Sequence, residues 1–387
     1  MPGVTDEIIP FRVDVPDAVL HDLRERLGRT RWPDQIPGSA WDYGTDLTAL
    51  QSLCAHWRTT FDWRAAEATL NAFPQFTTEI DGQRIHFIHV RSPHADALPL
   101  VITHGWPGSV WEFMRIIGPL TDPTAHGGRA EEAFHVVAPS MPGYGFSGPT
   151  SEPGWDPRRI ATAWATLMAR LGYDRYGAQG GDWGAIVTSA LGRVDPEHLT
   201  GIHLNMVVAR PPDPADPTAG VAPDEIEGMQ AMARFQADET GYQQIQGTKP
   251  QTLSYGLTDS PAGLAGWILE KFRTWSDCGG DVLSRFSADD LLANITIYWV
   301  TGTIGSSCRL YCESRRTGGS AAVSARVEVP TGAAIFPKEL YRPPRAWAEA
   351  AYNIVHWQRY PSGGHFAAME EPDVLVGDVR TFFADRR

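Results

Sequence analysis

Residues 180–184 read GGDWG, and this stretch decides the fold. The spacing Gly180-x-Asp182-x-Gly184 is that of the G-x-S-x-G turn, in which a strand breaks sharply into a helix and exposes a nucleophilic side chain. Aspartate stands here where serine is usual. The glycines are expected to permit the strained backbone and to leave room beside the tip. Because an apolar helical stretch, AIVTSALGRV (185–194), follows, the sequence predicts a strand, a turn at Asp182 and a helix.

Strand-like and helical patterns alternate on both sides of this turn. The apolar run LPLVITHGWPG (98–108) is typical of a buried parallel strand that ends in glycines. RRIATAWATLMARLG (158–172) has the spacing of a helix that stops at Gly172. The alternation predicts an α/β fold with a mostly parallel central sheet and helices on both faces. The other strand-like segments are residues 84–90, 134–147, 199–208, 325–336 and 356–366.

The same patterns divide the chain into four parts. Residues 1–75 carry amphipathic helical stretches and precede the alternation. Residues 76–208 form the first part of the core. The alternation fails over residues 209–320, which we interpret as an inserted, mainly helical cap. Residues 321–387 return to strands, end in a helix and complete the core.

Charge and hydropathy restrict the partners. The chain of 387 residues has 46 acidic and 33 basic residues and a net charge of −13, which disfavours nucleic acid and anionic membranes. We find no signal-peptide pattern and no run of the roughly 18–20 apolar residues that span a bilayer, so we expect a soluble, cytoplasmic protein. Only three basic residues are lysine, a bias typical of GC-rich bacterial genomes. Homo-oligomerisation stays open.

Neither a cofactor nor a metal site is predicted. Residues 143–148, GYGFSG, match the glycine spacing of a dinucleotide-binding turn, but the following PTSEPGWDP cannot start the helix that such a site needs. Of the four cysteines, only Cys308 and Cys312 lie close together, and no further zinc ligands surround them. We expect four reduced thiols.

A nucleophile at this turn needs a histidine and an acid that orients it. His365 follows a strand and two glycines in SGGHFAAMEEP, and Glu339 follows the preceding strand in IFPKEL. The chain order of nucleophile, acid and histidine is the one that this kind of turn requires. Glu370, Glu371 and Asp373 are poorer candidates, because they come after the histidine.

Two backbone amides are candidates for an oxyanion hole. One belongs to Trp183, the residue after the nucleophile, and the second must come from a loop after an earlier strand. HGWPG (104–108) is such a loop, and the amide of Trp106 is its best candidate.

An aspartate nucleophile implies a distinct chemistry. A carboxylate is already ionised at neutral pH and can displace a leaving group at saturated carbon, which gives an ester on the enzyme. Water activated by His365 would then hydrolyse that ester. The substrate classes are epoxides and alkyl halides, and an epoxide oxygen also needs a proton donor. Composition does not choose among the tyrosines of the cap region, which are Tyr242, Tyr255, Tyr298 and Tyr311.

Long motifs resemble the microsomal-type epoxide hydrolases, a branch of the α/β-hydrolase superfamily. The resemblance covers nearly the whole chain, including an N-terminal segment like the one that wraps the core in that family. The motifs occupy residues 73–92, 103–113, 139–147, 180–184, 246–272, 298–307 and 363–372.

The resemblance implies an α/β-hydrolase fold and an epoxide hydrolase that forms a vicinal diol from a small-molecule epoxide and water. By it, Asp182 is the nucleophile, His365 the base and Glu339 the acid. Tyr242 and Tyr311 would protonate the epoxide oxygen. A haloalkane dehalogenase and a non-catalytic small-molecule receptor are the alternatives, and the complete Asp–Glu–His set argues against a receptor. Detoxification and secondary metabolism are both compatible with this reading.

Overall fold

One large sheet forms the centre of the computed structural model, which describes residues 6–318 and 325–387. Its strands are β1 (Ile9–Phe11), β2 (Gln75–Ile80), β3 (Gln83–Val90), β4 (Leu98–Thr103), β5 (Phe134–Pro139), β6 (Tyr176–Gly180), β7 (Leu199–Leu204), β8 (Val327–Ile335) and β9 (Tyr352–Arg359). They lie in the order β1-β2-β3-β5-β4-β6-β7-β8-β9. The pairs from β1 to β5 are antiparallel, and all pairs from β5 to β9 are parallel.

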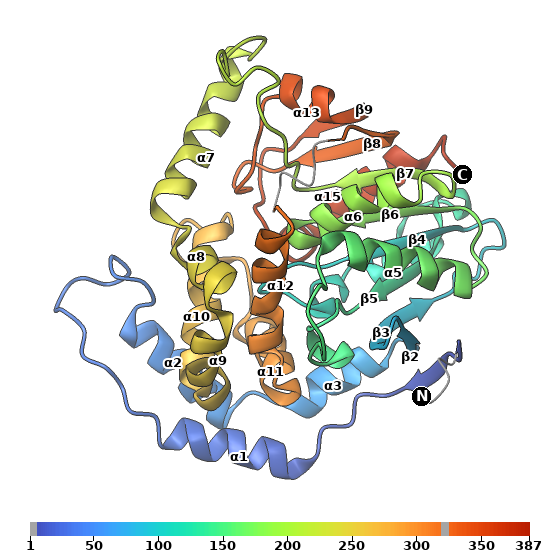
Figure 1. The fold of residues 1–387 in the computed structure, drawn as a ribbon. Helices are drawn as coiled ribbons and strands as arrows, with labels where there is room; N and C mark the ends of the chain where they lie inside the picture. The colour runs from blue at the N-terminus through green and yellow to red at the C-terminus, as the bar shows by residue number, and fades with distance from the viewer. Residues whose placement is uncertain (1–5, 319–324) are drawn as a thin grey trace.

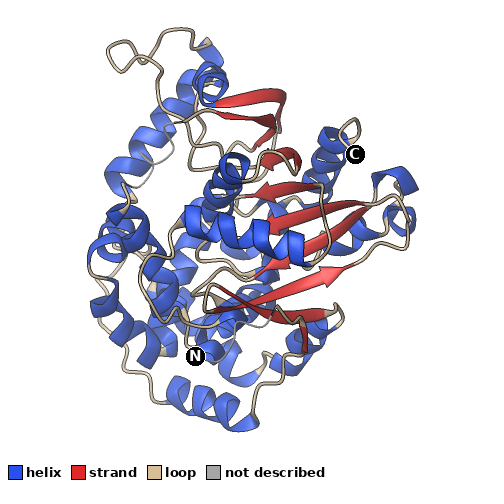
Figure 2. Ribbon diagram, turned by 45° about the vertical axis from the view of Figure 1, so that its right-hand side comes forward, coloured by secondary structure: helices blue, strands red, loops and turns tan. Residues whose placement is uncertain are grey.

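Helices cover both faces of this sheet (Figure 2). Those of the core are α4 (Ile117–Thr121), α5 (Pro157–Arg170), α6 (Asp182–Val194), α13 (Arg345–Ala351), α14 (Ala367–Glu370) and α15 (Pro372–Phe383). In α5, Ile160, Trp164 and Leu167 are fully buried at helical spacing, so one apolar stripe packs inward. The predicted α/β-hydrolase fold with a mostly parallel sheet is confirmed.

Two local expectations were wrong. The strand expected at 356–366 is β9, which ends at Arg359, because Pro361, Gly363 and Gly364 turn the rest of the segment into a loop. The N-terminal part is not only helical, since β1 pairs with β2 at the edge of the sheet.

Between β7 and β8 the chain leaves the sheet and forms helices. These are α7 (Ile226–Asp238), α8 (Gly241–Thr248), α9 (Pro250–Asp259), α10 (Pro261–Trp275), α11 (Ala288–Thr301) and α12 (Ile304–Arg316). Helices α8 to α12 pack side by side next to the sheet (Figure 1). They fall within the expected cap, and the expected boundary at residues 320 and 321 lies outside the described residues.

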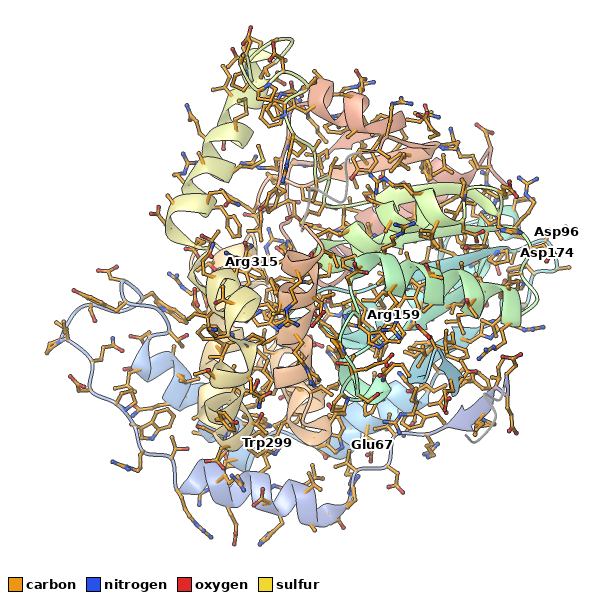
Figure 3. The ribbon with its side chains drawn as sticks, viewed as in Figure 1. Glu67, Asp96, Arg159, Asp174, Trp299 and Arg315 are labelled. Atoms are coloured by element: carbon orange, nitrogen blue, oxygen red, sulfur yellow. The ribbon has the colours of Figure 1, made fainter. Side chains whose placement is uncertain are left out.

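The N-terminal helices run along the outside of the cap (Figure 1). They are α1 (Asp17–Gly28), α2 (Leu47–Thr59) and α3 (Trp63–Asn71). The indole of Trp57 donates a hydrogen bond to the Thr296 hydroxyl at 2.9 Å in a buried contact. The Arg26 guanidinium lies 5.8 Å from the ring of Trp299, which Figure 3 labels. Residues 6–75 therefore connect the sheet edge to the cap, and the four-part division is kept as a proposal.

No helix in the described parts of the chain combines the length and the apolar character needed to cross a membrane.

A buried acid ties the last helix to the sheet. Asp378 of α15 accepts hydrogen bonds from His203 Nε2 at 2.8 Å, His356 Nε2 at 2.7 Å and the Tyr360 hydroxyl at 2.7 Å. Burial alone would raise the pKa of Asp378, but the bonds from the two histidines outweigh it and hold this pKa well below its usual value. Because burial without partners is costly for a carboxylate, these contacts stabilise the fold.

We expect Asp378→Asn to lower the free energy of unfolding by about 3–5 kcal/mol at neutral pH, as found when one partner of a buried charged pair is removed. The pKa of Asp378 is lower in the folded than in the unfolded chain. The stabilisation is therefore complete above about pH 4 and decreases as the pH falls. Urea denaturation of both proteins at several pH values measures the difference.

Asp373→Asn is the matched control, because Asp373 is exposed in the first turn of the same helix. It should cost at most about 1 kcal/mol through the helix dipole. Equal losses in the two variants would contradict a special role for Asp378.

Candidate active site

The GGDWG turn has the strained backbone that its sequence predicts. Asp182 has φ of 50°, a left-handed conformation that is uncommon for residues other than glycine. A Cβ added to Gly180 would lie 2.3 Å from the Gly184 carbonyl carbon, and one added to Gly184 would lie 1.9 Å from the Thr103 carbonyl oxygen. Backbone therefore fills the room that the glycines leave. This packing fixes Asp182 at the carboxyl end of β6.

The HGWPG loop lies directly against the nucleophile turn. The backbone amide of Trp106 donates a hydrogen bond of 2.7 Å to Asp182 Oδ1. A Cβ added to Gly105 would lie 2.3 Å from the Asp182 Cβ, so only glycine permits this approach. Trp183 follows Asp182 in the first turn of α6, where backbone amides lack intrahelical partners. The Trp106 amide thus binds the Asp182 carboxylate, and the amide of Trp183, the other candidate for an oxyanion hole, belongs to the next residue of the turn.

His104 holds this loop, and we did not single it out from the sequence. Its Nε2 accepts a hydrogen bond from the Met141 amide at 3.2 Å, so its Nδ1 carries the proton and donates to the Gly105 carbonyl at 3.0 Å. Burial lowers the pKa of His104 to about 4, which keeps the ring neutral. Its position at the start of HGWPG was the available signal.

His365 and Glu339 form the expected pair. The Nδ1 of His365 donates to Glu339 Oε1 at 2.8 Å, and the Leu340 amide donates to the same oxygen at 2.6 Å. The Nε2 of His365 lies 3.3 Å from Asp182 Oδ2. Burial lowers the pKa of His365, but Glu339 and Asp182 outweigh it, so this pKa lies well above its usual value. The resting site holds an imidazolium between two carboxylates.

Two cap tyrosines complete the aromatic surroundings of Asp182. Tyr242 of α8 and Tyr311 of α12 meet edge to face with ring centroids 5.7 Å apart. Trp106 stacks on Tyr242 at 5.3 Å, and Trp183 meets Tyr311 edge-on at 4.7 Å. Burial, and to a smaller extent the charge of Asp182, raise the pKa of Tyr242. Burial, together with Tyr242 and Asp182, also raises the pKa of Tyr311. Both phenols are protonated at neutral pH.

The structure separates the tyrosines that composition could not. Tyr255 is 71% exposed on the outside of the cap. Tyr298 is buried, and its hydroxyl donates to the Gly108 carbonyl at 2.6 Å. The Tyr311 hydroxyl is buried without a hydrogen-bond partner in the described part of the chain, and Tyr242 accepts one bond from Gln243 at 3.0 Å. Tyr311 therefore has an unused donor next to Asp182.

The acids beyond His365 have other tasks. Glu370 accepts hydrogen bonds from the Phe366 amide at 3.0 Å and the Asp277 amide at 2.8 Å, so it fixes the loop around the histidine. Asp373 is exposed at the start of α15. Within residues 6–318 and 325–387 no group of three or more His, Cys, Asp or Glu side chains is arranged to hold a metal ion.

Glu112 is a buried acid at the site that we missed in the sequence. It lies in the short 3-10 helix η1 (Val110–Phe113), directly after the HGWPG loop. Its side chain borders a small cavity that Asp182 and His365 also line. The signal was present in SVWEF (109–113), where an acid stands between apolar residues.

Comparisons with known proteins identify the family. A family model described as "Epoxide hydrolase N terminus" matches residues 8–113, and one described as "alpha/beta hydrolase fold" matches residues 99–255.

Full-length relatives point the same way. Epoxide hydrolase 1 of Oryctolagus cuniculus is 40% identical, with 98% of this chain and 90% of that protein covered. The crystal structure of juvenile hormone epoxide hydrolase from the silkworm Bombyx mori has a TM-score of 0.90 at 32% identity, covering 99% of this chain and 96% of that one. The Aspergillus niger epoxide hydrolase structure has a TM-score of 0.89 at 32% identity, covering 99% and 98%. The chain belongs to the epoxide hydrolase family of the α/β-hydrolase fold.

Proposed function

We propose that this protein converts small-molecule epoxides to vicinal diols through an ester on Asp182. The observation that carries the proposal is the pair of buried, protonated phenols of Tyr242 and Tyr311 beside a carboxylate nucleophile. A strained epoxide needs both an attacking atom and a proton donor. The names of the relatives support the same substrate class.

In the first step, an Asp182 oxygen attacks an epoxide carbon. Oδ1 is held by the Trp106 amide, which leaves Oδ2 as the attacking atom. The new bond joins Oδ2 to carbon, the carbon–oxygen bond of the ring breaks, and its electron pair stays on the epoxide oxygen. Tyr242 or Tyr311 gives this oxygen a proton. Because a desolvated phenolate is costly, it takes a proton from the His365 imidazolium through solvent, which leaves His365 neutral for the second step.

In the second step, water attacks Cγ of the Asp182 ester. His365 takes the water proton, and the negative charge that develops on Oδ1 is stabilised by the amides of Trp106 and Trp183. The tetrahedral intermediate then expels the diol oxygen, which takes the proton from His365, and Asp182 is left as a carboxylic acid. Its proton passes to the neutral His365, which restores the carboxylate and the imidazolium of the resting site. His365 must be neutral to act as a base. Esterification removes one of the two carboxylate charges that raise its pKa, which favours this form.

The rival activities make less use of these residues. A halide leaves without a proton, so a dehalogenase would have no use for two buried phenols beside the nucleophile. A receptor has no need of an imidazole fixed between Glu339 and Asp182.

We expect Tyr242→Phe and Tyr311→Phe each to slow ester formation from an epoxide, and the double variant to lose about 10²–10⁴-fold, the usual contribution of a general acid. Stopped-flow or rapid-quench measurement of the first turnover gives the rate. Tyr255→Phe is the control, because that ring is on the surface. A double variant that opens epoxides at the wild-type rate would remove the tyrosines from the mechanism.

We expect His365→Gln to form the ester but not to hydrolyse it, since glutamine cannot take the water proton. Intact-protein mass spectrometry after mixing with styrene oxide should show one adduct, and peptide mapping should locate it on the segment with Asp182. An unmodified protein after full loss of activity would contradict the covalent route.

A single turnover in ¹⁸O-labelled water separates the ester route from direct hydration. With enzyme in excess, the diol of the first turnover should carry unlabelled oxygen, because that oxygen comes from Asp182. Later turnovers should release labelled diol. Labelled diol in the first turnover would overturn the mechanism.

A further inference from the structure

A water-sized cavity lies on the core side of the Asp182 carboxylate. Its volume is about 20 Å³, and a water molecule needs roughly 10–15 Å³ measured in this way. Every residue that lines it belongs to the core, and Tyr242 and Tyr311 are not among them. The two phenols that would protonate the epoxide oxygen therefore do not border the cavity, although Trp106, which stacks on Tyr242, does.

The cavity offers the polar partners that a water requires. Asp182, His365 and Glu112 line it, together with the buried amides of Gln179 and Asn205. A buried water makes about three hydrogen bonds on average, so an apolar hollow of this size would stay empty. The lining therefore favours an ordered water beside the nucleophile.

The chain makes specific room for the Glu112 carboxyl. A Cβ added to Gly108 would lie 1.6 Å from Glu112 Oε1, so the carboxyl occupies the space that any other residue at 108 would fill. The Gly105 amide lies close enough to the carboxyl to lower its pKa, by less than burial raises it. Burial is the main cause that raises the pKa of Glu112 to about 8. The charge of His365 lowers this pKa and the charge of Asp182 raises it, and each has a smaller effect than burial. At neutral pH the group is mainly a neutral acid.

The imidazole also faces this space. Its orientation is fixed by the bond from Nδ1 to Glu339. The Nε2 atom is 3.3 Å from Asp182 Oδ2 but has no aligned hydrogen-bond partner among residues 6–318 and 325–387. A water in the cavity would give Nε2 the partner that it lacks.

We propose that Glu112 binds and orients the water that hydrolyses the Asp182 ester, an inference that rests on the proposed function above. The water donates one hydrogen bond to Nε2 of His365 and a second to the carbonyl oxygen of the protonated Glu112 carboxyl. A lone pair of the water then points at Cγ of Asp182. The bonds made and broken are those of the second step already described, and Glu112 gains and loses no proton.

A neutral acid suits this task better than a carboxylate. A carboxylate would compete with His365 for the water proton and would repel the charge of resting Asp182. Glutamine has the same shape and also offers a carbonyl oxygen. We therefore expect Glu112→Gln to keep most of the function and Glu112→Leu to lose it.

A purely structural role for Glu112 makes a different prediction. Glu112 contacts the Gly105 amide, and the same loop presents Trp106 to Asp182. If the carboxyl only held this loop, its loss would disturb the nucleophile and slow ester formation as well as hydrolysis. Binding of the hydrolytic water affects the second step alone.

The test measures both half-reactions in the same protein. Excess enzyme is mixed with styrene oxide and quenched at intervals, and the ester is quantified by mass spectrometry. For Glu112→Leu we expect ester formation within about threefold of wild type and ester hydrolysis slowed by about 10²-fold, the upper range for the loss of one buried hydrogen-bond partner. The ester should therefore build up before it decays. Glu112→Gln should restore hydrolysis to within about tenfold of wild type.

Two further variants serve as a second test and as a control. Gly108→Ala should push the Glu112 carboxyl out of place and slow hydrolysis selectively, which serves if Glu112→Leu does not fold. Glu67→Gln is the matched control, because this buried acid, labelled in Figure 3, lies in the N-terminal helix α3 and not in the α/β part of the chain that forms the site. It should lower stability without changing the ratio of the two rates.

The outcomes separate this inference from the proposed function. If His365→Gln traps the ester but Glu112→Leu hydrolyses it at the wild-type rate, the proposed function stands and the role of Glu112 is overturned. Equal slowing of both steps in Glu112→Leu would also overturn it in favour of a structural role. If wild type and His365→Gln form no ester at all, the proposed function itself fails.

Discussion

The hydrogen bond of 2.7 Å from the Trp106 amide to Asp182 Oδ1 is the contact on which the rest of the site depends. It joins two turns that end neighbouring parallel strands, β4 and β6. The approach is possible only because Gly105 and Gly184 have no side chains, since a Cβ on either would overlap protein atoms. The sheet thus sets the distance between the two turns, and the glycines allow the turns to come into contact. Once Oδ1 is held, only Oδ2 is available for attack.

Charge links the two half-reactions. In the resting site His365 lies between Glu339 and Asp182, which together raise its pKa despite burial. Such an imidazolium cannot serve as a base. In the mechanism proposed above, esterification of Asp182 removes one negative charge, and the same change makes His365 available as a base for water attack. The phenols of Tyr242 and Tyr311 stay neutral through burial.

Much of the fold and the triad could be predicted from sequence because both follow from local patterns. The GGDWG spacing forces one backbone geometry, and the alternation of strands and helices allows few topologies. The edge strand β1 has only three residues, which is too short for a period of two to be recognised. Composition alone left four cap tyrosines open, and only the resemblance pointed to Tyr242 and Tyr311, because their packing beside Trp106 and Trp183 depends on the folded cap. Glu112 was missed although it stands between apolar residues, because its place beside Asp182 and His365 depends on the folded chain.

The residues proposed for the two half-reactions come from different parts of the molecule. The proposed proton donors for the leaving oxygen belong to the cap, whereas the residues that line the water-sized cavity belong to the core. The two parts are nevertheless joined at the histidine, because the carbonyl of Trp275 in the cap helix α10 accepts a hydrogen bond of 3.0 Å from the His365 amide. The N-terminal helices contact the cap through Trp57 and Thr296, and β1 pairs the same segment with the sheet. A substitution in the cap can therefore affect the histidine as well as the space for the substrate.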